Sequence, residues 1–216
     1  QDDSVTGVGT AGKAGKMSPK NLLVSTVTDQ LKLATNFRSK VYGVSLKDRG
    51  GILPAGHFAD AAFWFDGETG NWITSSYYMN ELPKWLENFN GQKLAEKYLD
   101  KWNTLYPINT YVQSEKDGNP YRENYKGVNK MQFPYDLKSL KKDNGIGLIR
   151  NTPFGNSLTK DIAIAIIDNE KLGQNEKGIT DFLAVSFSST DYVGHQFSPN
   201  TIETEDTYLR LDKDLE

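Results

Sequence analysis

The chain has 216 residues, of which 37% are hydrophobic, 25% charged and 12% aromatic, and its formal net charge is −3. This length allows a substantial buried core. No run approaches the ~18 consecutive apolar residues of a membrane helix, so no membrane span is expected. The basic residues are scattered, which argues against a nucleic-acid-binding surface. The absence of cysteine excludes disulfides, thiolate metal sites and cysteine nucleophiles, and leaves the redox compartment unspecified.

The two ends of the sequence favour a segment of a longer polypeptide. The first residue is Gln1, and no charged region followed by an apolar signal segment is present. Residues 207–216 read as a helix that stops partway. We therefore expect the remainder of the chain's own polypeptide to be a partner of these residues.

Residues 1–46 predict a loop, a helix and a strand in that order. Ser18 resembles the N-cap of a helix over residues 19–37. A β-rich run over residues 40–46, followed by charge and then by Gly50 and Gly51, predicts a buried strand.

The next elements are a hairpin and two short helices. Residues 61–65 and 71–76 are rich in aromatic and β-branched side chains and flank a glycine-containing turn, which predicts an aromatic β-hairpin. Residues 82–89 and 91–102 follow a 3.6-residue apolar period with a break between them.

The second half begins with a long irregular insertion over residues 103–157, rich in Pro, Gly, Asn and Tyr. Residues 158–168 predict a buried helix, residues 180–187 a strand covered on both faces, and residues 201–216 a helix. Covered strands that alternate with helices predict an α/β fold with α/β/α layers. We expect residues 1–216 to form one partial domain that contains the insertion.

Two strand ends carry side chains suited to chemistry, because sites in open α/β sheets form at the carboxyl ends of strands. After the second strand, Asp191 and His195 are four residues apart and could converge on one Zn²⁺ ion, with Gly194 allowing a tight backbone before the imidazole. The pattern is weak by itself. A loop Asp that caps the next helix, beside a surface His, is the open alternative.

After the first strand, Lys47 and Arg49 alternate with Asp48, so that both cations could point toward an anion. Arginine matches phosphate oxygens with two donors, and lysine supplies a mobile charge. The alternative is a solvated turn in which Asp48 pairs with its neighbours. We expect the cationic pair and the Asp–His pair to face the same small anion.

Two further features have simpler interpretations. His57 could bind a metal, but a buried histidine satisfied by hydrogen bonds is favoured. An aromatic group could stack on sugars, although hairpin core is favoured for it. Its members are Phe63, Trp64, Phe65, Trp72, Tyr77 and Tyr78.

Residues 182–200 resemble the metal-binding segment of the alkaline phosphatase superfamily. Residues 38–57 and 61–73 are similar to the phosphate-clamp segment of the same group and to the stretch that follows it. The likeness is greatest to the bacterial phosphate-irrepressible alkaline phosphatases of the Bacteroidetes type, which are relatives of the nucleotide pyrophosphatase/phosphodiesterases.

The resemblance implies a secreted or periplasmic two-zinc phosphatase that hydrolyses small-molecule phosphate monoesters through a phospho-threonine intermediate. It implies that Asp191 and His195 bind one zinc ion, and that Lys47 and Arg49 contact phosphoryl oxygens and favour monoesters over diesters.

In this family pattern the nucleophilic threonine and the other zinc ligands lie outside residues 1–216, so we expect the segment alone to be inactive and to bind zinc weakly. The alternatives are a phosphodiesterase or nucleotide pyrophosphatase of the same superfamily and, in another class, a carbohydrate-binding module built on the aromatic hairpin.

Overall fold

The computed structural model describes residues 1–115, 123–128, 132–175 and 178–216. These residues form two compact units. Unit 1 comprises Gln1–Lys93 and Thr159–Ser186, and unit 2 comprises Leu94–Leu158 and Phe187–Glu216. Helix α6 (Phe154–Glu170) contributes residues to both units.

Unit 1 is built on a sheet that, in the described parts of the chain, has the strand order β1-β4-β3-β2-β7. The strands are β1 (Gly7–Val8), β2 (Val41–Ser45), β3 (Ala61–Phe65), β4 (Trp72–Ser75) and β7 (Phe182–Ser186). Strands β3, β2 and β7 are parallel, and β4 is antiparallel to both β3 and β1. The predicted hairpin is confirmed, with Trp64 opposite Ile73 and Phe65 opposite Trp72.

The helices of unit 1 differ from the prediction near the N-terminus and directly after β2, where no helix was predicted. They are η1 (Lys13–Gly15), η2 (Pro19–Asn21), α1 (Val27–Ala34), α2 (Asp48–Ala55), α3 (Lys84–Gly91) and the later part of α6. The prediction of a helix from residue 19 is wrong, because only the single turn η2 follows Ser18. Helix α1 starts at Val27, where Thr26 and Asp29 each accept a hydrogen bond from the other's backbone N–H group.

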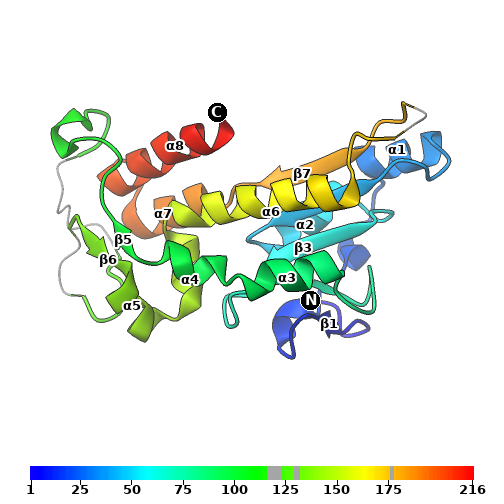
Figure 1. Ribbon diagram of the computed structural model, residues 1–216, viewed down its shortest axis with the longest axis horizontal. Coiled ribbons are helices and arrows are strands. Elements are labelled where there is room, and N and C mark those ends of the chain that lie inside the picture. Colours follow the sequence, from blue (N-terminus) through cyan, green and yellow to red (C-terminus); the bar gives the residue numbers. More distant parts are fainter. Residues whose placement is uncertain (116–122, 129–131, 176–177) are drawn as a thin grey trace. The chain divides into compact units, whose positions relative to one another are not determined.

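One face of the sheet is covered by α3 and α6. Tyr42 of β2 stacks on Phe63 of β3, and Phe63 packs edge-on against Trp85 of α3 with 5.8 Å between ring centroids. Glu170 at the end of α6 accepts hydrogen bonds from the Tyr42 hydroxyl and from the Trp85 indole N–H, each 2.8 Å long. Figure 1 shows α3 and α6 on the same side of these strands.

The opposite face is covered by α2. Ile52 of this helix forms a buried cluster with Ala62, Trp64 and Ile73 of the hairpin. Helix, sheet and helix thus form the three layers predicted from the sequence.

Helix α2 lies unusually close to β2, and glycines make this possible. A Cβ atom on Gly43 would lie 2.1 Å from the carbonyl oxygen of Gly51 and 2.9 Å from the Cβ atom of Ala55. A Cβ atom on Gly50 would lie 2.5 Å from the Ser45 hydroxyl oxygen. The buried strand predicted before Gly50 and Gly51 is confirmed, and both glycines lie in the helix that follows it.

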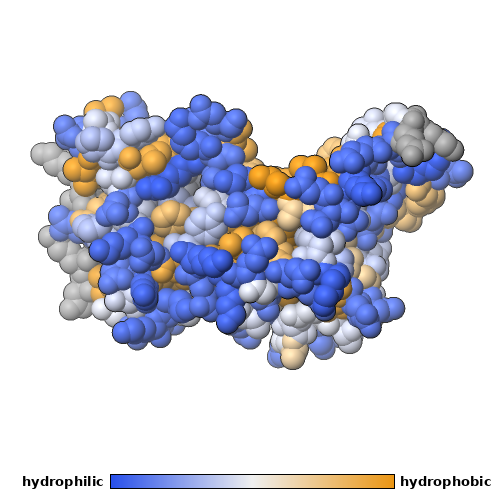
Figure 2. Space-filling model, viewed as in Figure 1, coloured by the Kyte–Doolittle hydropathy of each residue, from blue (hydrophilic) through white to orange (hydrophobic). Residues whose placement is uncertain are grey.

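Strand β7 has the predicted position but not the predicted coverage. It ends the strand order among the described residues, and Phe182 is 36% exposed. Figure 2 shows hydrophobic side chains at the surface over α6 and β7, where Ile164, Ile167 and Phe182 are exposed. The near-continuous apolar run belongs here to an edge strand.

Unit 2 contains short elements and two longer helices. They are α4 (Leu94–Tyr98), β5 (Lys101–Trp102), η3 (Ile108–Thr110), β6 (Tyr135–Asp136), α5 (Leu137–Asn144), η4 (Ile146–Asn151), the start of α6, α7 (Ser189–Phe197) and α8 (Ile202–Leu215). Parts of the predicted insertion, residues 116–122 and 129–131, lie outside the described residues. The predicted terminal helix is confirmed. No helix in the described parts of the chain has the length and hydrophobicity of a membrane span.

One buried carboxylate organises the start of this insertion. Asp206 of α8 accepts hydrogen bonds from the Trp102 indole, the backbone N–H of Leu105 and the Arg210 guanidinium, each 2.7 Å long. It also accepts one from the Tyr111 hydroxyl. A buried charge is stable only when it is compensated in this way, so α8 fixes the path of the preceding loop.

The glycine contact predicts a strong effect of one added methyl group. Gly43→Ala in the full-length polypeptide should destabilise the fold by about 2–3 kcal/mol, because α2 must move off the sheet. Urea-unfolding midpoints followed by tryptophan fluorescence would measure the loss. Gly91→Ala is the matched control, since a Cβ atom there meets nothing within 4 Å and alanine favours the helix. Equal stability of the two variants would contradict the close-contact argument.

Candidate metal and phosphate site

The two strands predicted to carry the site end at the same edge of the sheet. β2 and β7 are parallel neighbours, and their last residues, Ser45 and Ser186, are register partners. Along the chain, Lys47 follows β2, and β7 leads into α7 with Asp191 and His195.

Lys47 and Arg49 lie at the beginning of a helix, and not across a strand end as predicted. Lys47 is the N-cap residue of α2, and Arg49 is in the first helical turn. The backbone N–H of Lys47 donates to the Ser45 hydroxyl over 3.1 Å. Arg49 is exposed and Lys47 is half-buried. The first N–H groups of a helix and its dipole favour anions, so the helix adds to the attraction of the two cations.

Asp191 and His195 also belong to a helix, which was not predicted from the sequence; a loop position for Asp191 belonged only to the alternative interpretation. They are one turn apart on α7, which places them on the same face. The His195 Nε2 atom lies 3.4 Å from the Asp191 Oδ1 atom, and the side chains are 82% and 52% exposed. Both side chains line a pocket of about 520 Å³ in unit 2, and Gly194, Thr204 and Tyr208 are among its other lining residues.

The donor atoms of this pair suit zinc, which binds carboxylate oxygen and neutral imidazole nitrogen. A zinc site needs three or four protein ligands in most proteins, and the described residues contain no group of three His, Cys, Asp or Glu side chains that could hold a metal. Asp191 and His195 therefore fit part of a zinc coordination shell. That this pair and the Lys47–Arg49 pair face one anion stays a prediction.

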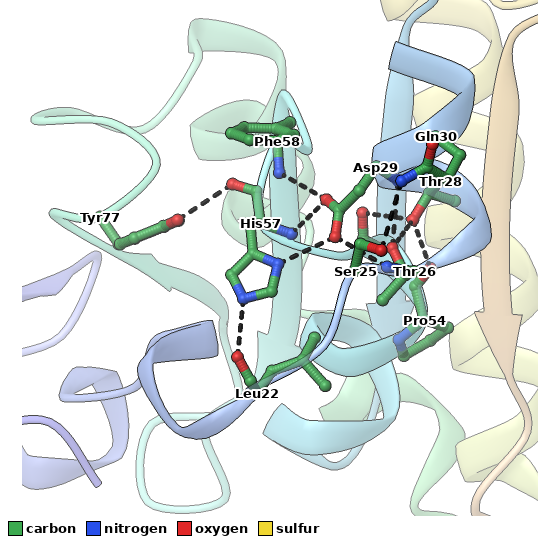
Figure 3. A network of polar contacts seen from close by, with 11 residues as sticks. Leu22, Ser25, Thr26, Thr28, Asp29, Gln30, Pro54, His57, Phe58 and Tyr77 are labelled. Carbon is green, nitrogen blue, oxygen red and sulfur yellow. Dashed lines mark hydrogen bonds and ion pairs between the residues drawn. The ribbon is translucent and has the colours of Figure 1, made fainter. Parts of the chain in front are cut away.

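His57 has the predicted role of a hydrogen-bonded structural residue, although its side chain is 28% exposed. Its Nδ1 atom lies 2.8 Å from the Asp29 carboxylate and its Nε2 atom 2.9 Å from the Leu22 carbonyl oxygen (Figure 3). Both partners are acceptors, so this arrangement favours the imidazolium form, in which each ring nitrogen donates a hydrogen bond. The hydrogen bond to Asp29, and then that to Leu22, raises the pKa of His57.

Asp29 is held as a carboxylate by the same network. Burial acts to raise its pKa, but hydrogen bonds from His57 and from the backbone N–H groups of Thr26, Phe58 and His57 outweigh burial and lower the pKa to about 2. Figure 3 shows these donors converging on the carboxylate from α1 and from the segment after α2.

The aromatic hairpin is core, as favoured from the sequence. Phe63, Trp64, Phe65 and Trp72 are almost fully buried. Tyr77 is exposed, and its hydroxyl donates to the His57 carbonyl oxygen over 2.9 Å. The sugar-stacking surface thus loses four of its six members, which removes the basis of the carbohydrate-binding alternative.

Residues 18–216 match the family model described as Type I phosphodiesterase / nucleotide pyrophosphatase, and the chain belongs to this family. Over its whole length it is 63% identical to a protein named calcium-transporting ATPase from Myroides odoratus and 57% identical to the alkaline phosphatase PhoV of Synechococcus elongatus. It is 54% identical over 99% of its length to the alkaline phosphatase PafA of Elizabethkingia meningoseptica. The chain spans 39% of the length of each of these relatives.

The crystal structure of wild-type alkaline phosphatase PafA has the same fold, with a TM-score of 0.95 and 52% identity over all of this chain and 41% of that one. A second similar structure, with 51% identity and the same TM-score over all of this chain and 42% of that one, is a PafA variant. In this variant a lysine and an arginine that are separated by one residue are both replaced by alanine. The predicted resemblance to the alkaline phosphatases is confirmed.

The His57–Asp29 pair predicts a pH-dependent stability. The raised pKa of His57 means that its contribution is complete below the unfolded-state value of about 6.5 and is lost as the pH rises through the higher folded-state pKa. The lowered pKa of Asp29 means that its contribution is present above about pH 4 and is lost as the pH falls toward about 2.

We expect His57→Gln in the full-length polypeptide to cost about 1–3 kcal/mol of unfolding free energy at pH 6 and clearly less at pH 9. Urea-unfolding midpoints at both pH values would measure the difference. Tyr77→Phe removes a neutral hydrogen bond from the same network, and its cost should not change with pH. A His57→Gln cost that is the same at both pH values would show that the ring is not charged.

Proposed function

We propose that these residues are the central part of a phosphate monoester hydrolase. The observation that carries the proposal is the placement of Lys47 and Arg49 at the start of α2, directly after a buried parallel strand. Two cations and a helix N-terminus together form a site for a highly charged anion. The similarity to proteins named alkaline phosphatase supports the same reaction.

In the proposed reaction Lys47 and Arg49 hold the non-bridging phosphoryl oxygens. The Arg49 guanidinium is planar and can donate to two oxygens, while the Lys47 ammonium acts as a point charge. A monoester has more charge on these oxygens than a diester, so the clamp stabilises the monoester transition state more strongly.

Asp191 and His195 would supply a carboxylate oxygen and a neutral imidazole nitrogen to one zinc ion, and other parts of the polypeptide would complete its coordination and hold a second ion. Zinc polarises phosphoryl oxygens and lowers the pKa of bound water. A threonine outside residues 1–216 would attack phosphorus as the alcohol leaves, and water would then cleave the phospho-threonine to release phosphate. We place the enzyme in the periplasm or outside the cell.

A phosphodiesterase or nucleotide pyrophosphatase is the second candidate, and the description of the family model favours it. The two candidates differ in the charge of the group that Lys47 and Arg49 must stabilise. Rates on matched monoester and diester substrates decide between them.

Removal of either cation should therefore act selectively. We expect Lys47→Ala or Arg49→Ala in the full-length polypeptide to lower kcat/KM for an aryl phosphate monoester by about 10²–10³-fold. The loss for the matched methyl aryl diester should be about tenfold or less, because less charge is stabilised. Lys84→Ala is the control, since Lys84 is an exposed lysine paired with Glu87. Equal losses on both esters would contradict the clamp.

The metal assignment makes a separate prediction. Asp191→Asn and His195→Asn should each lower the zinc content of the purified full-length polypeptide by about one ion per chain, because a site of three protein ligands that loses one keeps only two, fewer than zinc sites use. Atomic emission measures the content directly. His57→Gln alters the other histidine of the chain and should leave the zinc content unchanged. Full zinc occupancy in both Asp191→Asn and His195→Asn would refute the assignment.

A further inference from the structure

The pocket beside Asp191 and His195 extends well past the pair. Its walls come from the exposed faces of α7 and α8, and Ser198 and Pro199 lie between the two helices in sequence. A phosphoryl group is small compared with a volume of about 520 Å³, so the pocket has room for more of a ligand than its phosphate.

Gly194 lies in the interior of α7, where glycine costs about 1 kcal/mol relative to alanine. Packing does not require it, because a Cβ atom at this position would meet nothing within 4 Å. This contrasts with Gly43, where the backbone of α2 fills the space. What the missing side chain provides at residue 194 is room in the pocket, next to His195.

Tyr208 lines the same pocket from α8. The neighbouring residues Asp206 and Thr207 are fully buried, whereas Tyr208 is 58% exposed. One turn earlier, the Thr204 hydroxyl donates to the Ser198 carbonyl oxygen over 2.8 Å and fixes this part of α8 to the end of α7. A large aromatic ring is thus held at the pocket surface with much of its area open to a ligand.

We propose that this recess binds the organic group of the phosphate ester, and that Tyr208 and Gly194 make it selective for flat aromatic groups. The ring of Tyr208 supplies a stacking surface. Because Gly194 has no side chain, the pocket keeps enough space there for a planar group to enter. The inference rests on the proposed function, because Asp191 and His195 are taken to hold the zinc ion that would bind the phosphate end of the same ligand.

Non-hydrolysable phosphonates test the recess without turnover. Isothermal titration calorimetry of the zinc-loaded full-length polypeptide would compare phenylphosphonate, cyclohexylphosphonate and methylphosphonate. The phenyl and cyclohexyl groups are similar in apolar size but differ in flatness. We expect phenylphosphonate to bind about threefold to tenfold more tightly than cyclohexylphosphonate.

Tyr208→Ala should abolish this preference and leave the affinity for methylphosphonate unchanged, and Tyr208→Phe should retain the preference. Gly194→Ala should weaken phenylphosphonate binding alone. Tyr106→Ala removes another exposed tyrosine of unit 2 that does not line the pocket, and it should change nothing. Tyr208→Leu, which keeps the bulk, provides a second test of the stacking surface and should also lose the preference.

The possible failures are distinguishable. If none of the phosphonates binds to the wild-type polypeptide, both the proposed function and the recess are wrong. If all three bind but the phenyl preference is absent, or survives in Tyr208→Ala, the recess alone is wrong. An equal loss of affinity for all three ligands in Tyr208→Ala would also overturn it, because it would show a general structural role for the tyrosine.

Discussion

The contact between β2 and α2 is the constraint on which the rest of unit 1 depends. Gly43 and Gly51 allow the helix backbone to lie directly on the strand, at a separation that any larger residue at position 43 would exceed. The chain therefore turns from β2 into α2 within two residues. This short turn makes Lys47 the N-cap and puts Arg49 in the first turn, so the packing of two glycines determines where two cations lie.

The sequence predicted those elements whose residue types are locally clear. The hairpin, β2, α6 and α8 are confirmed: β-branched and aromatic runs beside turn residues indicated the strands, and longer runs without glycine or proline indicated the helices. Helix α2 was missed because its Gly-Gly pair and Pro54 oppose a helix locally, and contact with the sheet stabilises it instead. The helix predicted from residue 19 failed because apolar residues near its start are not buried. Leu23 is apolar, but it is 92% exposed and lies outside any helix.

The candidate site also contains residues that the sequence could identify and one that it could not. Residue type and the positions of strand ends were sufficient to select Lys47, Arg49, Asp191 and His195. They did not show that Lys47 is a helix N-cap and that the other three lie on helices. Tyr208 had no signal in the sequence, because a single tyrosine in an amphipathic helix has no pattern that distinguishes a pocket wall from ordinary surface. Its position beside the Asp–His pair appears only when α7 and α8 are folded against each other.

The two histidines of the chain show how surroundings assign different roles to the same chemical pair. A metal ligand must be a neutral imidazole with a free lone pair. Both ring nitrogens of His57 face oxygen acceptors, and four hydrogen bonds hold the Asp29 carboxylate. This favours the protonated His57 ring, and the pair fastens α1 to the end of α2. His195 and Asp191 are both exposed on one helix face and open into a pocket. Burial and acceptor geometry, rather than residue type, therefore direct the zinc proposal to His195 and away from His57.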